Sequence, residues 1–325
     1  MRALLTAAVL AAGACATSQQ ITISGDPACV LDDGDKAWLA RAPDVWRTVS
    51  HDIFELASPD PHVTYVLFDA QCAFTSEDAR TWSSVAHGGQ VALPDGQILP
   101  AQVTSFAAPA PDGSAMMVMA LPTVWRADDV SSEMGLDRLM FAVLSHEMTH
   151  TRQFTAYGAR IEALAKSVGV GDDMTDDFIQ DVFATNAEFV ASVERERDLL
   201  FAAAAEIDDA KARTLAREAL SLVNARRNKW LTGDKTPMAE LEDIFLTMEG
   251  AGQFAGLSWL SSGRGGGLDG ASALSGMRRG KRWSQDEGLA LFMVLDRFSP
   301  EWPAQVFGAQ PKSGLSLLAA ALGSS

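Results

Sequence analysis

The segment His146-Glu147-Met148-Thr149-His150 constrains this 325-residue chain more than any other feature. Its two histidines are four residues apart, so an α-helix would place both imidazoles on one face, about one turn from each other. Imidazoles at that spacing reach a single metal ion. Apolar residues with helical spacing precede the motif, at Leu136, Leu139, Met140, Val143 and Leu144. The motif is therefore predicted to lie inside a helix and to form part of a metal site.

Glu147 gives this predicted site a chemical role. It adjoins His146 and would reach a water molecule activated by the metal without being a ligand itself. Zinc lowers the pKa of such a water towards neutrality, and a neighbouring carboxylate accepts its proton. His-Glu-x-x-His on a helix is therefore a zinc-hydrolase signature. The alternative is a surface helix with two solvated histidines, but histidine is scarce here, with five in the chain, so a chance match is rare.

Residues 143–151 resemble the active-site helix of the zincin metallopeptidases. In that family the two histidines of the motif bind zinc and the glutamate activates water, so the resemblance gives these roles to His146, His150 and Glu147. Arg152 stands where the family usually carries an apolar residue. The resemblance covers one helix of the chain.

A catalytic zinc needs three protein ligands and one open position for water. No histidine follows His150, and Gln153 and Phe154 stand where a third-histidine zincin would continue its motif, so that branch is excluded. A downstream carboxylate is expected instead, as in the glutamate zincins (gluzincins). The remaining histidines belong to no spaced pair and are expected to be structural or exposed: His51, His62 and His87.

Glu249, in residues 245–254 (FLTMEGAGQF), is the predicted third ligand. The segment resembles the Glu-Gly-x-Ala-x-Tyr segment of the zinc aminopeptidases, with Gly252 in place of alanine and Phe254 in place of tyrosine. Gly250 beside the ligand would let its helix approach the motif helix closely. The separation from His150 is longer than in common gluzincins and requires a helical insertion. The alternatives lie nearer in sequence, on a helix face expected to be solvated: Glu188, Glu194 and Glu196.

Residues 1–16 have a charged start, an apolar run and small residues, which is typical of a secretory signal. Residues 12–15 (AGAC) resemble the lipobox of bacterial lipoproteins, in which Cys15 would carry lipid; simple cleavage after Ala14 or Ala16 is the alternative. The expected location is the bacterial envelope, either the periplasm or the outer membrane. Cys29 and Cys72 then remain either as a disulfide pair or as two free thiols.

The charge balance narrows the expected partners. The chain has 26 basic and 42 acidic residues and a formal net charge of −16. Such a surface repels phosphate backbones, so nucleic acid is not expected as a partner. A peptide or protein substrate is expected, with a possible lipid anchor to a membrane through Cys15.

The predicted fold class is α+β and mostly helical, with a small N-terminal mixed sheet packed on the zincin active-site helix. Strands are predicted at 62–68, 91–93, 98–99, 103–106 and 116–121. The last of these is either the strand with a free edge beside the cleft or a buried core strand. Helices are predicted at 35–40, 45–56, 178–205, 212–222, from Thr236 through Glu249, at 284–298 behind a capping box at Ser284 and Glu287, and at 313–322.

This pattern predicts three regions: the signal segment 1–16, an α/β zincin-like part at 18–157, and a helical part at 158–325 that supplies the third ligand. The expected function is that of a zinc metallopeptidase in which Zn²⁺ is held by His146, His150 and Glu249. Tyr157 or Arg226 would stabilise the oxyanion. Two alternatives are a non-catalytic zinc-binding envelope lipoprotein and an amide hydrolase directed at peptidoglycan. Glu147 argues against the first, because a binding protein needs only the ligands.

Overall fold

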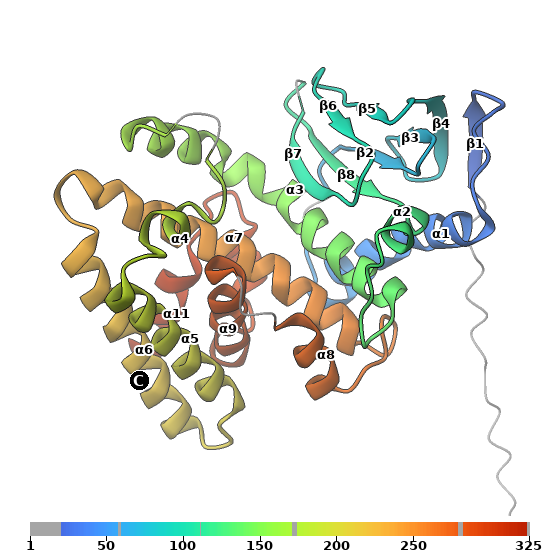
Figure 1. Ribbon diagram of the computed structural model, residues 1–325. Helices are drawn as coiled ribbons and strands as arrows, with labels where there is room; N and C mark the ends of the chain where they lie inside the picture. Colours follow the sequence, from blue (N-terminus) through green and yellow to red (C-terminus); the bar gives the residue numbers. More distant parts are fainter. Residues whose placement is uncertain (1–20, 58–59, 111, 171–173, 279–281, 324–325) are drawn as a thin grey trace, which may run out of the picture.

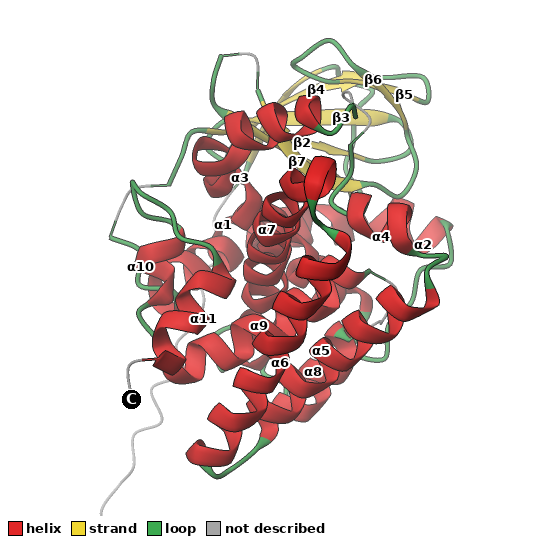
Figure 2. Ribbon diagram, turned by 90° about the vertical axis from the view of Figure 1, so that its left-hand side faces the viewer, coloured by secondary structure: helices red, strands yellow, loops and turns green. Residues whose placement is uncertain are grey.

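The computed structural model describes residues 21–57, 60–110, 112–170, 174–278 and 282–323. The predicted signal segment 1–16, with Cys15, lies outside these residues. The described chain is an α+β structure that is mostly helical, as predicted. In Figure 2 the strands gather at one end of the molecule and helices fill the rest.

Within the described residues, the N-terminal part forms a mixed sheet with the strand order β1-β4-β3-β2-β8-β7 and a separate hairpin, β5-β6. Parallel pairs join β1 to β4 and β2 to β8, whereas the other neighbours are antiparallel. The strands are β1 (Thr22–Gly25), β2 (Val63–Phe68), β3 (Cys72–Ser76), β4 (Thr81–Ala86), β5 (Gln90–Ala92), β6 (Ile98–Pro100), β7 (Ser105–Pro109) and β8 (Ala115–Ala120).

The helices are α1 (Asp33–Arg47), continued by a π-helical turn η1 (Thr48–Ile53), α2 (Pro122–Ala127), α3 (Leu136–Ser167), α4 (Phe178–Phe183), α5 (Ala187–Ala205), α6 (Asp209–Trp230), a 3-10 turn η2 (Gly233–Lys235), α7 (Thr236–Ser261), α8 (Gly270–Met277), α9 (Trp283–Phe298), α10 (Trp302–Val306) and α11 (Gly314–Gly323). Helix α3 packs on β7 and β8, and the helices α3, α7, α9, α5 and α6 then pack one on the next, away from the sheet (Figure 1). The boundary predicted at 157/158 falls within α3.

The strand predicted at 116–121 is β8, and of its two alternatives the buried core strand is confirmed, whereas the free sheet edge is wrong. β8 lies between β2 and β7, and all its residues are buried. Its run of alanine, methionine and valine suits a strand that is covered on both faces. The edge beside α3 is β7, whose residues are mostly half-buried. Strands β3 and β4 were not predicted, because their small and polar residues give little strand signal.

Two helix predictions also need correction. The predicted helix at 178–205 is two helices, because the Asn186 side chain accepts a hydrogen bond from the Phe189 N–H and starts α5 anew. The predicted capping box at Ser284 is wrong, since α9 already begins at Trp283 and both Ser284 and Glu287 are buried inside it. The Ser284 hydroxyl and the Glu287 carboxyl are therefore buried against neighbouring helices and do not cap the end of α9.

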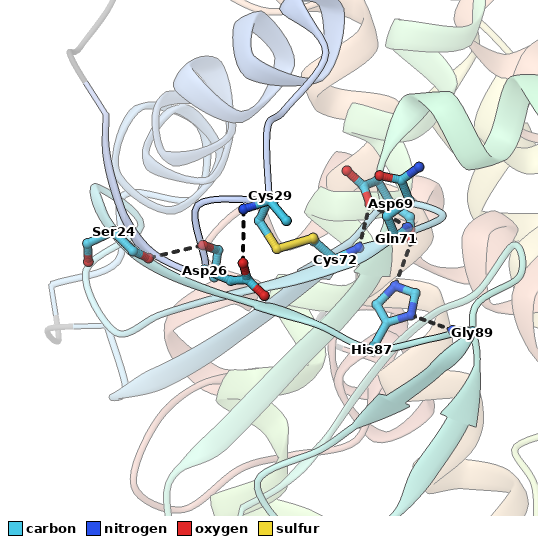
Figure 3. Close-up of a disulfide and its surroundings, with 10 residues drawn as sticks. Ser24, Asp26, Cys29, Asp69, Gln71, Cys72, His87 and Gly89 are labelled. Carbon is cyan, nitrogen blue, oxygen red and sulfur yellow. Dashed lines mark hydrogen bonds between the residues drawn. A yellow bond between two sulfur atoms is a disulfide. The ribbon is translucent and has the colours of Figure 1, made fainter.

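A disulfide joins Cys29 to Cys72, with 5.7 Å between the two Cα atoms, so the predicted pairing is confirmed (Figure 3). It ties the segment after β1 to the first residue of β3. Beside it, His87 contacts the Asp69 carbonyl through Nε2 and accepts the Gly89 N–H at Nδ1. His87 therefore has the structural role expected for it. Disulfides persist mainly in oxidising compartments.

A buried ion-pair network links the C-terminal helices. Arg226 of α6 donates to both oxygens of Glu196 on α5 and to Glu242 on α7. The side chains of Arg226 and Glu196 are fully buried. Burial, together with the nearby Glu196 carboxylate, raises the pKa of Glu287 on α9 well above its usual value. The Arg226 guanidinium thus compensates acidic groups from three neighbouring helices.

Among the described residues, no helix combines the length and the apolar composition that crossing a membrane requires.

Candidate metal centre

Helices α3 and α7 lie side by side (Figure 1), and each contributes side chains to one buried cluster. His146, Glu147 and His150 are buried on α3, which is the helix predicted for the motif. Glu249 is buried on α7. The two segments far apart in sequence therefore meet across one helix–helix interface.

The ligand atoms of this cluster converge on one point. Nε2 of His146 lies 3.3 Å from Oε2 of Glu249, and Nε2 of His150 lies 3.1 Å from Oε1. The two Nε2 atoms are 2.8 Å apart. All the ligand atoms lie within 4.8 Å of one another, so His146, His150 and Glu249 could hold a metal ion.

The alternative carboxylates are engaged elsewhere. Glu188 pairs with Lys229 at the surface, and Glu194 is exposed. Glu196 is buried against Arg226 in the ion-pair network. None of the three joins the histidines, and among the described residues Glu249 is the carboxylate that does.

Two glutamines orient the ligands. Nδ1 of His150 donates to Oε1 of Gln153 at 2.8 Å, which leaves Nε2 directed at the cluster. The other end of Gln153 donates to the Met248 carbonyl, at 3.4 Å. Gln285 donates to Oε2 of Glu249 at 3.1 Å. Such outer partners fix the tautomer and the orientation of metal ligands.

Glycine lets α7 approach α3 closely, but at a different position from the one expected. A Cβ at Gly252 would lie 2.7 Å from Nδ1 of His146, so only glycine fits against that ring. Gly250, which was expected in this role, faces α9, where a Cβ would meet the Gly288 carbonyl oxygen at 2.6 Å. Gly252 therefore sets the spacing at the cluster, and Gly250 sets the spacing between α7 and α9.

The electrostatics of the cluster favour an ionised carboxylate. Burial opposes the charge on Glu249, but His150 and His146 outweigh it and lower the pKa of Glu249 below its usual value. Burial also opposes a charged His150, yet attraction to Glu249 prevails and raises the pKa of His150 to about 9. A metal ion requires the deprotonated imidazole, so its binding near neutral pH would release this proton.

A cavity of about 380 Å³ adjoins the cluster, and both His146 and Glu147 line it. Its wall includes Ser105 at the start of β7, Gln253 on α7, and Arg282 and Gln285 at the start of α9. Glu147 thus borders open space next to His146.

Neither residue predicted to stabilise an oxyanion faces this cavity. The Tyr157 hydroxyl donates to the Lys312 carbonyl at 3.3 Å, and its ring packs in an apolar cluster with Leu241 and Phe245. Arg226 is enclosed in the ion-pair network. Both predictions are therefore wrong.

Sequence reasoning missed four polar residues at this site: Gln153, Gln253, Arg282 and Gln285. Helical spacing could have indicated two of them. Gln153 is three residues after His150, and Gln253 is four residues after Glu249, so each shares a helix face with a ligand. No local pattern marks Arg282 or Gln285, because α9 reaches the site only through its packing on α7.

We expect His146→Ala, His150→Ala and Glu249→Ala each to remove the bound metal, because each deletes one ligand atom. Gln153→Ala should weaken metal binding about 10- to 100-fold, the usual cost of losing an outer partner. Elemental analysis after dialysis against defined free metal measures both effects. Glu188→Ala is the matched control and should keep full occupancy. Full occupancy in Glu249→Ala would refute the assignment of that ligand.

No protein-family model, curated protein or solved structure matches this chain. Its function is therefore argued from the geometry of the site.

Proposed function

We propose that this protein is a zinc-dependent hydrolase of peptide-type bonds, with zinc held by His146, His150 and Glu249. The observation that carries the proposal is the convergence of two imidazoles and one carboxylate beside a cavity that Glu147 also lines. Two histidines and a carboxylate form a common ligand set of catalytic zinc, which keeps one position open. A purely structural site would be closed by a fourth protein ligand.

When bound, zinc would polarise the scissile carbonyl and lower the pKa of the attacking water. Glu147 then accepts the proton of that water as its oxygen bonds to the carbonyl carbon. As the carbon–nitrogen bond breaks, Glu147 passes the proton to the leaving nitrogen. Gln153 and Gln285 hold the ligands in place throughout.

The developing oxyanion needs a donor, and Gln253 is the side chain best suited to that role. It lines the cavity with His146 and Glu147, one helical turn beyond Glu249. Its amide bonds to no other side chain or backbone group in the described part of the chain, whereas Gln285 is held by Glu249. A neutral amide that faces the reaction centre stabilises the transition state without competing for the metal.

Strand β7 offers a path for an extended substrate. It is the edge of the sheet beside α3, and its first residue, Ser105, lines the cavity. Its last residue, Pro109, lines a second hollow with Thr151 and Phe154, on the other side of the motif. A peptide paired with the free edge of β7 would therefore pass Glu147 between the two hollows.

The test is metal-dependent cleavage. We expect chelated protein to lose hydrolysis of a quenched fluorescent peptide library and to regain it with about one equivalent of Zn²⁺ per chain. Mass spectrometry of the products should show cleavage at amide bonds. Parallel assays with casein and with purified cell-wall peptides distinguish a peptidase from a peptidoglycan hydrolase. Equal rates in chelated and zinc-loaded protein would reject the proposal.

Replacing Gln253 with alanine should lower kcat by about 100-fold or more, as losing one oxyanion donor does in other hydrolases. The substitution deletes only the donor, so KM and zinc content should change little. Steady-state kinetics with one efficiently cleaved peptide measures the effects on kcat and on KM separately. Gln305→Ala, on α10, serves as the control. A change confined to KM would place Gln253 in substrate binding instead of catalysis.

A further inference from the structure

Arg282 brings a positive charge to the cavity beside the metal centre in a chain whose net charge is −16. It occupies the N-cap position of α9, and about half of its side chain is exposed. Among the described side chains that line this cavity, Arg282 is the one arginine or lysine. The charge of Arg282 can therefore influence which substrates bind in this cavity.

The Arg282 guanidinium is held from one side only. Its Nη1 group donates to Asp177, whose side chain is almost fully buried and therefore fixes the arginine in place. In the described part of the chain, no other hydrogen bond or ion pair engages Nε or Nη2 of Arg282. An arginine has five N–H donors in a planar fork that matches a carboxylate with two parallel hydrogen bonds. Nε and Nη2 are therefore available to a ligand in the cavity that Arg282 lines.

The cavity wall also carries two acidic side chains, of which Glu147 lies next to the metal cluster. Asp286 also lines the cavity, but Arg197 lies 3.6 Å from it and Arg278 lies 3.9 Å from it on the side of a neighbouring hollow. Gln285 and Asp286 belong to the first turn of the 16-residue helix α9, so the N-terminal end of α9 borders the cavity. The partial positive charge of a helix N-terminus adds to the attraction from Arg282.

We propose that Arg282 binds a carboxylate of the substrate, so that the enzyme selects acidic peptides. This inference rests on the proposed hydrolase function, since it assigns the substrate class of the same site. The carboxylate comes either from an aspartate or glutamate side chain near the scissile bond or from a free C-terminus. Both sources present the same planar anion to the fork of Arg282.

Matched peptides test the proposal. Starting from a peptide that the zinc-loaded protein cleaves, each position within two residues of the scissile bond is made Glu, Gln or Lys, with a free or an amidated C-terminus. We expect Glu to exceed Gln in kcat/KM at one position, or the free terminus to exceed the amide, and this preference identifies the source. Arg282→Ala should lower kcat/KM for the preferred acidic peptide about 10- to 100-fold. Its effect on the neutral partner should stay within about twofold.

The control is Arg195→Ala. Arg195, on α5, is about as exposed as Arg282 and, within the described part of the chain, forms one ion pair, with Glu218. Arg195→Ala should leave kcat/KM unchanged for both the acidic and the neutral peptide. A wild-type protein without preference for the acidic peptide, or an Arg282→Ala variant that slows both peptides equally, would overturn the proposal.

A binding measurement separates this proposal from the hydrolase function. Fluorescence anisotropy with labelled Glu-containing and Gln-containing peptides is recorded on zinc-loaded Glu147→Gln protein, with and without Arg282→Ala. Tighter binding of the acidic peptide that Arg282→Ala abolishes supports carboxylate recognition, even if wild-type protein cleaves no peptide and the hydrolase function fails. Equal binding of both peptides rejects recognition by Arg282, whatever the catalytic result.

Discussion

Replacing Glu147 with glutamine is expected to lower kcat for peptide hydrolysis by about 100- to 10,000-fold, the range that a general acid–base group contributes. Glutamine has nearly the shape of glutamate but cannot accept the proton of the attacking water. Glu147 belongs to no ligand set in the cluster, so zinc content should stay the same. The variant therefore separates chemistry from metal binding.

The measurement combines initial rates with elemental analysis of the same protein preparation. Glu218→Gln is a suitable control, because Glu218 is exposed on α6 and its ion pair among the described residues is with the surface residue Arg195. That control should retain wild-type rates. If Glu147→Gln kept full activity, Glu147 would not be the base. If no metal-dependent activity exists to lose, the non-catalytic zinc-binding protein would become the better interpretation.

Arg226→Met is expected to lower the free energy of unfolding by about 3–5 kcal/mol, the typical cost of removing one partner from a buried ion pair. Methionine fills much of the arginine volume, so the loss comes mainly from charge. Glu196 and Glu242 would remain buried without the guanidinium that now donates hydrogen bonds to both, although Glu242 would still pair with Arg227. Glu287 would lose the same nearby positive charge.

Urea-induced unfolding followed by circular dichroism gives this free energy. Arg195→Met provides the comparison at an exposed pair, where the expected loss is within about 1 kcal/mol. Replacing Arg226, Glu196 and Glu242 together by apolar residues should restore much of the stability, because these three interacting charges are then removed together. A single Arg226→Met variant as stable as wild type would show that the network contributes nothing to folding.

The metal-binding motif on α3 shows what local sequence patterns can predict. Four-residue spacing and apolar periodicity predicted the helix that carries His146, Glu147 and His150, because both patterns depend only on helical geometry. Resemblance indicated Glu249 as the acidic partner. These residues meet in the structure as one buried group.

Other features depend on contacts between distant segments. The strand at 116–121 was recognised, but its neighbours decide whether it is an edge or an interior strand. The sequence predicts that a glycine of α7 allows close helix packing, but only the packing shows that Gly252 contacts His146 and that Gly250 contacts α9. Ser284 and Glu287 match a capping box in sequence, although both are buried inside α9.

The sequence by itself determined the type and spacing of the candidate metal ligands on α3 and the mostly helical class, whereas it left open whether the two later cysteines form a disulfide. Only the tertiary structure decided which face of α7 turns to α3, and that α9 brings Gln285 and Arg282 to the same cavity. The reason is physical. Local spacing follows from backbone geometry within one element, whereas the position of one helix against another follows from the packing of all their side chains together.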